Sequence, residues 1–385
     1  MRRITLPERP DWRDKAREVG FGFHEMYGEP YWFEGAAYAF TLREIEEDIE
    51  EPTEALHELC MDLVADVVED EALLRRLHIP EDRFDLVRES WRQGDRHLYG
   101  RFDLAYDGTG PAKLLEYNAD TPTSIFEAAY FQHNWLIDQL DAGVLADGSD
   151  QFNLLQESLV EAFATFSNDR LLHFACWVEN EEDRGTCGYL MDCAVQAGHR
   201  VEMIDIRAIG TDAQGRFTDT ANRTIDRCFK LYPWEDMLRE PFAPHLKPGV
   251  FIEPLWKSIL SNKGILPLLW ERNTGHPNLL PAFFTDDPRA SELTEAVSKP
   301  LFSREGENVS LIENGAIAEA TQGDYAEQPR ITQAYAPLFS TDGQHAVVGS
   351  WVIGDRAAGI GMREDGGRIT RNLSRFVPHI ITDLD

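Results

Sequence analysis

Hydrophobic spacing divides the chain into a helical part followed by parts rich in strands. In the first hundred residues, apolar positions recur every three or four residues, as in "LREIEEDIEEPTEALHELCMDLVADVVEDEALLRRL", and predict mostly helix. Two more helices are expected, at 126–143, ended by Gly143, and at 154–167. Residues 1–170 are therefore expected to form a packing scaffold, interrupted only by a hairpin.

From residue 171 the pattern changes to strand, helix and strand. The segments are "LLHFACWVE", a short apolar strand, "EEDRGTCGYLMDCAVQAG", a helix closed by Gly198, and "HRVEMIDI", a second strand. Together they predict a parallel βαβ unit, in which ligands bind beyond the carboxyl ends of the strands. A further strand is expected in "RCFKLYPWE", and residues 171–245 are expected to form a substrate lobe. Three prolines in "REPFAPHLKPG" indicate a linker.

The last lobe, residues 250–385, is expected to be mainly antiparallel. It begins with "LWKSILSNKGILPLLWE", which is interpreted as one helix. Strands with tight turns follow in "AVSKPLFSREGENVSLIE" and "AVVGSWVIGDRAAGIGMREDGGRIT". The predicted fold class is thus α/β, or α+β, with a helical amino-terminal region.

Composition restricts the function classes. A chain of 385 residues with 43% hydrophobic residues can bury a large core, and it is expected to divide into two or three lobes. The formal net charge of -31 argues against nucleic-acid or anionic-membrane partners and indicates a solvated acidic surface. No apolar run is long enough to cross a bilayer and the start lacks a signal-peptide pattern, so a cytoplasmic location is expected. The five cysteines, without C-x-x-C pairs, are expected to be reduced structural thiols.

A hairpin carries the first candidate chemistry. "RFDLAY" and "PAKLLEYNAD" flank the turn signal "DGTG", and side chains alternate between faces along such strands. Arg101 and Asp103 therefore share one face, and so do Glu116 and Asn118. Oxygen donors on adjacent strands suit Mg²⁺, which takes few protein ligands and leaves positions for phosphates. The alternative is a surface salt-bridge ladder.

Isolated cations supply the second candidate chemistry. Lys263 and Lys299 lie among apolar or small residues, where an ammonium group needs an anion such as phosphate, unless its stem covers apolar surface and its head reaches water. The loop "SREGENVS", with Arg304 and Gly306, is suited to covering a triphosphate with backbone amides, or is an ordinary hairpin turn.

Arg363 is a further isolated cation, on the last predicted strand. Apolar residues flank it, and a buried guanidinium requires an anion. That anion is either a bound phosphate or one of the neighbouring carboxylates, Glu364 or Asp365.

These residues lie in long motifs that resemble one known family. The blocks "ERPDWR", "FHEMYGEPYW", "LLEYNADTPTS", "KLYPWE", "SNKGILPLLWE", "KPLFSREGENVS" and "SRFVPHI" resemble the glutathionylspermidine synthetase family, in particular bacterial stand-alone acid–amine ligases that lack the amidase domain. The resemblance runs from end to end. It implies an ATP-grasp fold in circularly permuted order, in which Mg-ATP phosphorylates a carboxylate and an amine then displaces phosphate to form an amide.

The resemblance also implies roles for individual residues. Magnesium ligands, for what are expected to be two ions, are Asp103, Glu116 and Asn118. Arginines at the reacting phosphate are Arg101 and Arg363. Nucleotide contacts come from Arg101, Lys263, Lys299, Arg304, Gly306 and Gln333, the last near the adenine hinge.

Substrate positions match the family less well. They correspond to Thr121, Thr123, Arg304 and the "EEDR" turn with Glu182 and Asp183. Glutathionylspermidine synthetases carry serines in place of the threonines, glutamate in place of Asp183, and cysteine after the arginine, where this chain has Glu305. Glutathione and spermidine specificity is therefore not carried over. The carboxylates of the turn either bind a cationic amine or simply begin a helix.

Two functions follow as hypotheses. The first is an ATP-dependent ligase that joins a small-molecule acid to a small-molecule amine. The second is a nucleotide-binding regulatory or accessory protein that keeps the fold without ligation. The pair of arginines at the reacting phosphate favours the first, because a module that only binds nucleotide would not need both.

Overall fold

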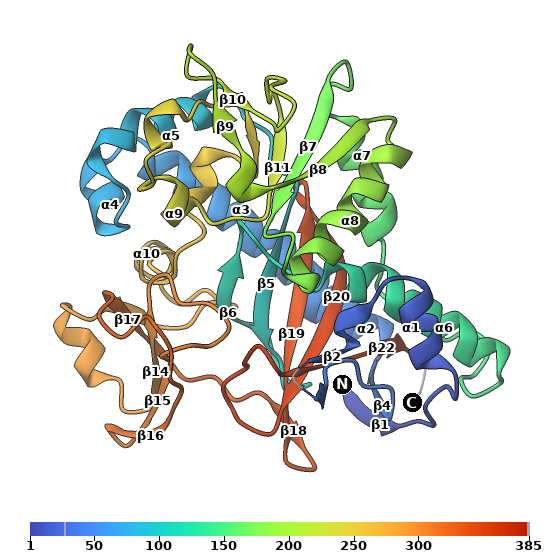
Figure 1. Cartoon of the computed structure of the whole chain (residues 1–385). Helices are drawn as coiled ribbons and strands as arrows, with labels where there is room; N and C mark the ends of the chain where they lie inside the picture. Colours follow the sequence, from blue (N-terminus) through green and yellow to red (C-terminus); the bar gives the residue numbers. More distant parts are fainter. Residues whose placement is uncertain (27, 383–385) are drawn as a thin grey trace.

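An antiparallel sheet joins the early hairpin to the end of the chain. The computed structural model describes residues 1–26 and 28–382. In the sheet, the strand order is β21-β20-β19-β5-β6, with β18 also paired to β19 (Figure 1). The strands are β5 (Tyr99–Ala105), β6 (Lys113–Asn118), β18 (Phe339–Thr341), β19 (Gln344–Ile353), β20 (Arg356–Asp365) and β21 (Arg375–Val377).

The predicted hairpin is confirmed as β5 and β6. Asp103 is opposite Glu116, and Arg101 is opposite Asn118. On the other side of β5, Gly349 of β19 is opposite Asp103. A Cβ atom on Gly349 would lie 2.9 Å from Cδ of Arg101, so the glycine leaves the space that this side chain occupies.

A second antiparallel sheet is formed by five strands of the last third of the chain. Its strand order is β13-β17-β14-β15-β16. The strands are β13 (Ala282–Phe284), β14 (Ala296–Pro300), β15 (Ser310–Glu313), β16 (Ala316–Ala320) and β17 (Arg330–Ala334). Lys299 lies on β14 and Gln333 on the neighbouring β17.

The expected βαβ unit is present in a parallel sheet of order β12-β11-β7-β8. Helix α8 (Glu181–Gln196) connects β7 (Leu171–Cys176) to β8 (Arg200–Asp205). The other parallel strands are β11 (Cys228–Lys230) and β12 (Phe251–Ile252), and a small hairpin is formed by β9 (Gly210–Thr211) and β10 (Phe217–Thr218). Figure 1 shows this sheet above the central one.

The amino-terminal region is less helical than predicted. Strands β1 (Arg2–Thr5), β4 (Ala36–Phe40) and β22 (His379–Ile381) form a third sheet in the order β1-β4-β22, and β2 (Glu25–Met26) pairs with β3 (Glu29–Pro30). All five residues of β4 are buried. Its partner β22 lies at the opposite end of the sequence, so local spacing did not reveal the pairing.

The predicted helical scaffold is otherwise present. Its helices are α1 (Trp12–Glu18), α2 (Leu42–Ile45), α3 (Glu51–Val67), α4 (Glu71–Arg76), α5 (Phe84–Arg92), α6 (Gln132–Asp141) and α7 (Leu155–Ala164). A π-helical turn, Glu46–Glu50, joins α2 to α3, and another, Glu127–Phe131, precedes α6. Within the described residues, no helix is long and apolar enough to cross a membrane.

Helix α3 packs against the central sheet and forms much of the core. Leu56, Leu63 and Val64 of α3 are completely buried in one hydrophobic cluster with Phe102 of β5 and Val348 of β19. Burying side chains of this size contributes roughly 1.5–3 kcal/mol each. The five cysteines are also buried and free, as predicted.

The single helix expected at 255–271 is wrong. A short 3₁₀ segment, Leu255–Ser258, is separated from α10 (Ile265–Arg272), and a short α9 (Trp234–Met237) precedes both. The side chain of Asn262 causes the break. Its Oδ1 accepts a hydrogen bond from the Gly264 amide at 2.8 Å, and its Nδ2 donates to the Leu77 carbonyl at 3.0 Å. Lys263 lies in this break.

Candidate active site

A cavity of about 450 Å³ lies where the central sheet, the β13–β17 sheet and the loops of the parallel sheet meet. Almost every candidate residue named from the sequence lines it, although these residues come from distant segments of the chain. Glu182 is the exception. The candidate residues in the lining are Arg101, Asp103, Glu116, Asn118, Thr121, Thr123, Asp183, Lys263, Lys299, Arg304, Gly306, Gln333 and Arg363.

The three oxygen-bearing side chains of the hairpin contact one another. Asn118 Nδ2 donates to Asp103 Oδ2 at 3.3 Å and to Glu116 Oε1 at 3.1 Å. Arg101 forms a two-point ion pair with Asp103, with N–O distances of 2.7 and 3.1 Å. The salt-bridge alternative is therefore partly correct, but it places the pair in a cavity wall rather than on an open surface, since the two side chains are 14% and 16% exposed.

Two lysines surround Glu116. Lys263 Nζ lies 3.2 Å from Glu116 Oε2 and donates to the Ser303 carbonyl at 2.6 Å. Burial alone would raise the pKa of Glu116, but the ammonium groups of Lys263 and Lys299 outweigh burial and hold that pKa at about 2. Glu116 is therefore ionised across the physiological pH range.

The carboxyl group of Asp103 is shifted in the opposite direction. Burial, supported by the charge of Glu116, raises the pKa of Asp103 despite its pairing with Arg101. Perturbed carboxyl groups in a cavity, shifted by burial and by specific charged neighbours, mark a candidate functional site.

Lys299 points into the interior. Its Nζ donates to the Leu115 carbonyl and to Gln333 Oε1, each at 2.8 Å. Burial lowers the pKa of Lys299 to about 8, although Glu116 acts to raise it. The alternative in which the lysine head reaches water is therefore wrong for Lys299. Gln333 lines the cavity with its amide already bonded, since its Nε2 donates to the Leu114 carbonyl at 2.9 Å.

The "SREGENVS" loop is a turn between β14 and β15 that encloses the cavity. Arg304 donates to Thr121 Oγ1 and to Glu235 Oε1, each at 2.5 Å. Gly306 has a φ of +70°, and a Cβ there would lie 2.2 Å from the Thr370 carbonyl oxygen, so only glycine fits. The sequence analysis did not identify Glu235, whose only signal was its place in the "KLYPWE" block.

Arg363 does not pair with either neighbouring carboxylate, so that alternative is wrong. Its guanidinium donates to the carbonyls of Ser374 and Asn372 at 2.9 Å and of Arg371 at 3.1 Å. Glu364 faces the other side of the strand, where it binds Arg3 and Arg375, whereas Asp365 binds Arg371 and Ser374. Within the part of the chain that the structure describes, Arg363 has no ion-pair partner, and its positive charge faces the cavity.

The "EEDR" segment is the first turn of α8, as the helix-start alternative predicted. Asn180 caps it, and its Oδ1 accepts from the amides of Glu182 and Asp183 at 3.0 and 3.2 Å. Asp183 nevertheless lines the cavity. Burial, together with the charges of Glu182 and Glu305, raises the pKa of Asp183 to about 7.

Apolar walls complete the cavity, and most of their residues lie outside the sequence motifs that carry the candidate chemistry. They are ordinary strand residues or lie next to strands, and nothing in their local pattern distinguishes them from core positions. Trp177, which is 45% exposed, also belongs to the lining, as do Asn180 and Asp183. The apolar lining includes Leu115, Val297, Val309, Leu311, Ala334, Leu338, Val347 and Ile369.

The chain is similar to several known ligases and synthetases. It is 39% identical to a Haemophilus influenzae protein provisionally named an acid–amine ligase, with 98% of this chain and 99% of that protein covered. It is 28% identical to trypanothione synthetase of Crithidia fasciculata and 27% identical to the bifunctional glutathionylspermidine synthetase/amidase of Escherichia coli, over 83% and 96% of this chain. The matched regions are 53% and 63% of those two proteins.

A solved structure and a family model extend the comparison. The apo structure of a glutathione synthetase-like effector from Globodera pallida superposes with a TM-score of 0.56 at 9% identity, covering 98% of this chain and 100% of the effector chain. This likeness shows a glutathione synthetase-like fold. The model described as glutathionylspermidine synthase preATP-grasp matches residues 3–382. The chain therefore belongs to the glutathionylspermidine synthase family.

Proposed function

We propose that this protein is an ATP-dependent carboxylate–amine ligase, which forms an amide through an acyl phosphate and releases ADP and phosphate. The observation that carries the proposal is the convergence of opposite charges in one cavity. The carboxylates of Asp103 and Glu116 and the amide oxygen of Asn118 lie beside two lysines, and the same lining includes arginines, Arg101 and Arg363 among them. Phosphoryl transfer to a carboxylate brings two anions together, so such a site needs positive charge more than a general base.

The chemistry of the hairpin's donor atoms fits magnesium. Asp103, Glu116 and Asn118 offer oxygen atoms from side chains in mutual contact, and Glu116 is ionised. We propose that they hold two Mg²⁺ ions, which would neutralise charge on the phosphates. In this arrangement the hairpin supplies rigidity, because both strands are fixed by backbone pairing to a larger sheet.

The nucleotide is assigned to the carboxyl-terminal lobe, residues 250–385, in the permuted ATP-grasp order. Membership of an ATP-grasp ligase family implies ATP as the phosphoryl donor. We propose that Lys263 and Lys299 contact its phosphates, with Arg304 and Gly306 covering them from the loop. Gln333 and the apolar lining of the β13–β17 sheet would then lie beside the adenine. Arg101 and Arg363 are assigned to the reacting phosphate.

The acid and the amine are assigned to the part of the cavity next to residues 171–245. Thr121 and Thr123 would contact the acid, together with Arg304, which is shared with the phosphates, and Asp183 would contact the cationic amine. Glu182 does not line the cavity, so a direct substrate contact by Glu182 has no support from its position. The ligase name of the Haemophilus influenzae relative supports this class of reaction without naming either substrate.

Phosphorus NMR of the purified protein with Mg-ATP tests the reaction class. Pooled carboxylates and pooled amines are supplied together, and each pool is omitted in turn. ADP and phosphate that form only with both pools establish ligation. Nucleotide binding without turnover in every pool would refute the proposal for those substrates and favour the accessory nucleotide-binding protein instead.

A pair of double variants tests the metal assignment. Asp103→Ala with Glu116→Ala is expected to abolish Mg²⁺-dependent ADP release, because both charged ligands are removed. Asp85→Ala with Glu89→Ala is the matched control, since it also removes one aspartate and one glutamate, but from exposed positions of α5. If the cavity variant retains the turnover of the control, the hairpin does not hold the metal.

A further inference from the structure

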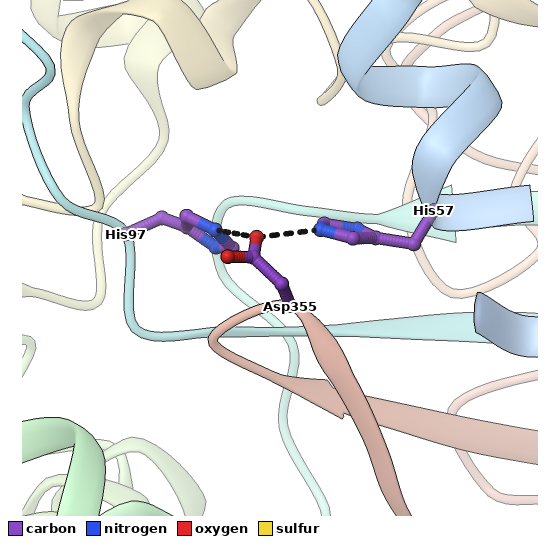
Figure 2. Close-up of side chains that lie close together, drawn as sticks. All are labelled: His57, His97 and Asp355. Carbon is purple, nitrogen blue, oxygen red and sulfur yellow. Dashed lines mark hydrogen bonds and ion pairs between the residues drawn. The ribbon is translucent and has the colours of Figure 1, made fainter.

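Two histidines and an aspartate meet at the end of the central sheet where β5 begins and β19 turns into β20. Figure 2 shows His57, from α3, and His97, from the segment before β5, on either side of the Asp355 carboxylate. Each Nε2 lies 3.1 Å from the same oxygen, Asp355 Oδ1. One ligand atom from each of the three residues lies within 4.8 Å of the other two. None of them lines the ligase cavity described above.

The three residues are held in place by the fold around them. The His57 and His97 side chains are only 3% and 9% exposed. The amide of Gly354, next to Asp355, donates to the Leu98 carbonyl at 2.8 Å and ties the hairpin turn to the histidine segment. The cluster is therefore built from rigid elements.

A second contact ties the helix to the same sheet. Thr53, one turn before His57 on α3, shares a hydrogen bond of 2.7 Å with Ser350 of β19. The His97 ring also packs edge-on against Trp256, with ring centroids 5.4 Å apart. All three segments of the cluster are thus positioned independently of any contact between the three side chains.

We propose that His57, His97 and Asp355 form a binding site for a divalent transition-metal ion of the zinc type. Zinc binds imidazole nitrogen and carboxylate oxygen at about 2.0–2.2 Å, so that tetrahedral ligands lie about 3.3 Å apart. The nitrogen-to-oxygen distances of 3.1 Å are close to that spacing. Asp355 is 76% exposed, so solvent can reach the site and supply the remaining ligand.

The second nitrogen of each ring is left without a hydrogen-bond partner in the described protein. These atoms are Nδ1 of His57 and Nδ1 of His97. A metal on Nε2 requires the ring proton to be on Nδ1, where the described protein offers no acceptor.

The missing hydrogen-bond partner of each Nδ1 bears on how tightly a metal ion would bind. Metal-ligating histidines usually donate their second N–H to an acceptor, and these two rings have none in the described protein. The affinity is therefore expected to be moderate. An ion here would join α3, the start of β5 and the β19–β20 turn, so its effect would be on stability rather than on the ligase chemistry.

The test uses Co²⁺ as a visible-absorption probe and Zn²⁺ in thermal unfolding, on the full chain stripped of metal. A large excess of Mg²⁺ keeps the oxygen donors of the ligase cavity from competing for the probe. Asp355→Asn removes the negative charge but keeps an oxygen that accepts from both rings, and its exposed position preserves folding. Asp342→Asn, at an exposed turn before β19, is the matched control.

The wild type and Asp342→Asn are expected to give the absorption bands of nitrogen- and oxygen-bound Co²⁺ and to gain thermal stability with Zn²⁺. Asp355→Asn is expected to bind at least about tenfold more weakly. Absence of these bands in the wild type, or equal affinity in Asp355→Asn, would overturn the proposal. The carboxylate would then serve only as a hydrogen-bond acceptor between two buried rings.

Discussion

Replacing Glu127 with glutamine is expected to stabilise the protein at alkaline pH and to have little effect in acid. Glu127 begins the π-helical turn before α6 and is completely buried. Its Oε1 accepts a hydrogen bond from the Tyr31 hydroxyl at 2.6 Å, but its Oε2 has no partner among the described residues. Burial, and next the charge of Glu182, raise the pKa of Glu127 to about 7.

The size and sign of the effect follow from this pKa. The ordinary value is 4.5, so the folded protein binds the proton more tightly than the unfolded chain does. The contribution of protonated Glu127 to the free energy of unfolding is complete below pH 4.5 and is lost as the pH rises through about 7. At about 1.4 kcal/mol per pKa unit, the loss is at most about 3 kcal/mol. Glutamine resembles the protonated acid and still accepts from Tyr31, so it avoids this loss.

Urea unfolding of both proteins at about pH 5 and about pH 8, on either side of the raised pKa, provides the measurement. The Glu127→Gln variant is expected to be up to about 3 kcal/mol more stable than the wild type at the higher pH, with a much smaller gain at the lower pH. Asp183 titrates in the same range, but it is present in both proteins and its contribution cancels. Glu161→Gln, at an exposed position of α7, is the control and should change stability by less than about 0.5 kcal/mol. A gain of equal size at both pH values, or none at the higher pH, would refute the reasoning.

Three further predictions concern the cavity and the thiols. Lys299→Met is expected to raise the KM for ATP by about 10- to 100-fold, because a hydrogen bond from a charged group contributes about 1.5–3 kcal/mol. The KM is measured from steady-state ADP release, and an unchanged KM would contradict the assignment of Lys299 to the nucleotide. Since the pKa of Asp183 is about 7, its carboxyl group becomes negative as the pH rises through 7, and the KM for the cationic amine should fall. This dependence of KM on pH should flatten in Asp183→Asn. Identical pH profiles in the two proteins would remove Asp183 from the amine site. All five cysteines are buried, so a thiol reagent such as DTNB should label none in the folded protein and all five in denaturant, and rapid labelling of the native chain would show that the packing described here is wrong.

The candidate site was largely predictable because its parts lie in local patterns. The turn signal and the alternation predict the hairpin and the faces that its side chains share, whereas the pairing of Asp103 with Glu116 also depends on a register shift between Asp103 and Leu104 that neither signal reveals. Period-two alternation could also have excluded Glu364 as the partner of Arg363, since adjacent strand residues face opposite sides. For Asp365, which shares a face with Arg363, the decisive contact is with Arg371 in the following loop.

Features that depend on distant pairing were not predictable. Strand β4 has an apolar pattern that local spacing assigned to a helical region, but its partner β22 is more than three hundred residues away in the sequence. The break before α10 depends on Asn262 reaching the Leu77 carbonyl, which no helix propensity reveals. The His57, His97 and Asp355 cluster likewise has no sequence signature, because its members are separated by long intervals.

The internal ion pairs of the cavity have a consequence for how ligands would be measured. Without ligands, Arg101 neutralises Asp103 and Lys263 neutralises Glu116, so an anion alone or a cation alone must separate a pair and leave one member uncompensated. A phosphate chain that arrives together with its metal gives both members new partners. Thermodynamic linkage then requires each ligand to increase the affinity for the other by the same factor. A dissociation constant for the nucleotide would therefore have meaning only at a stated concentration of free Mg²⁺.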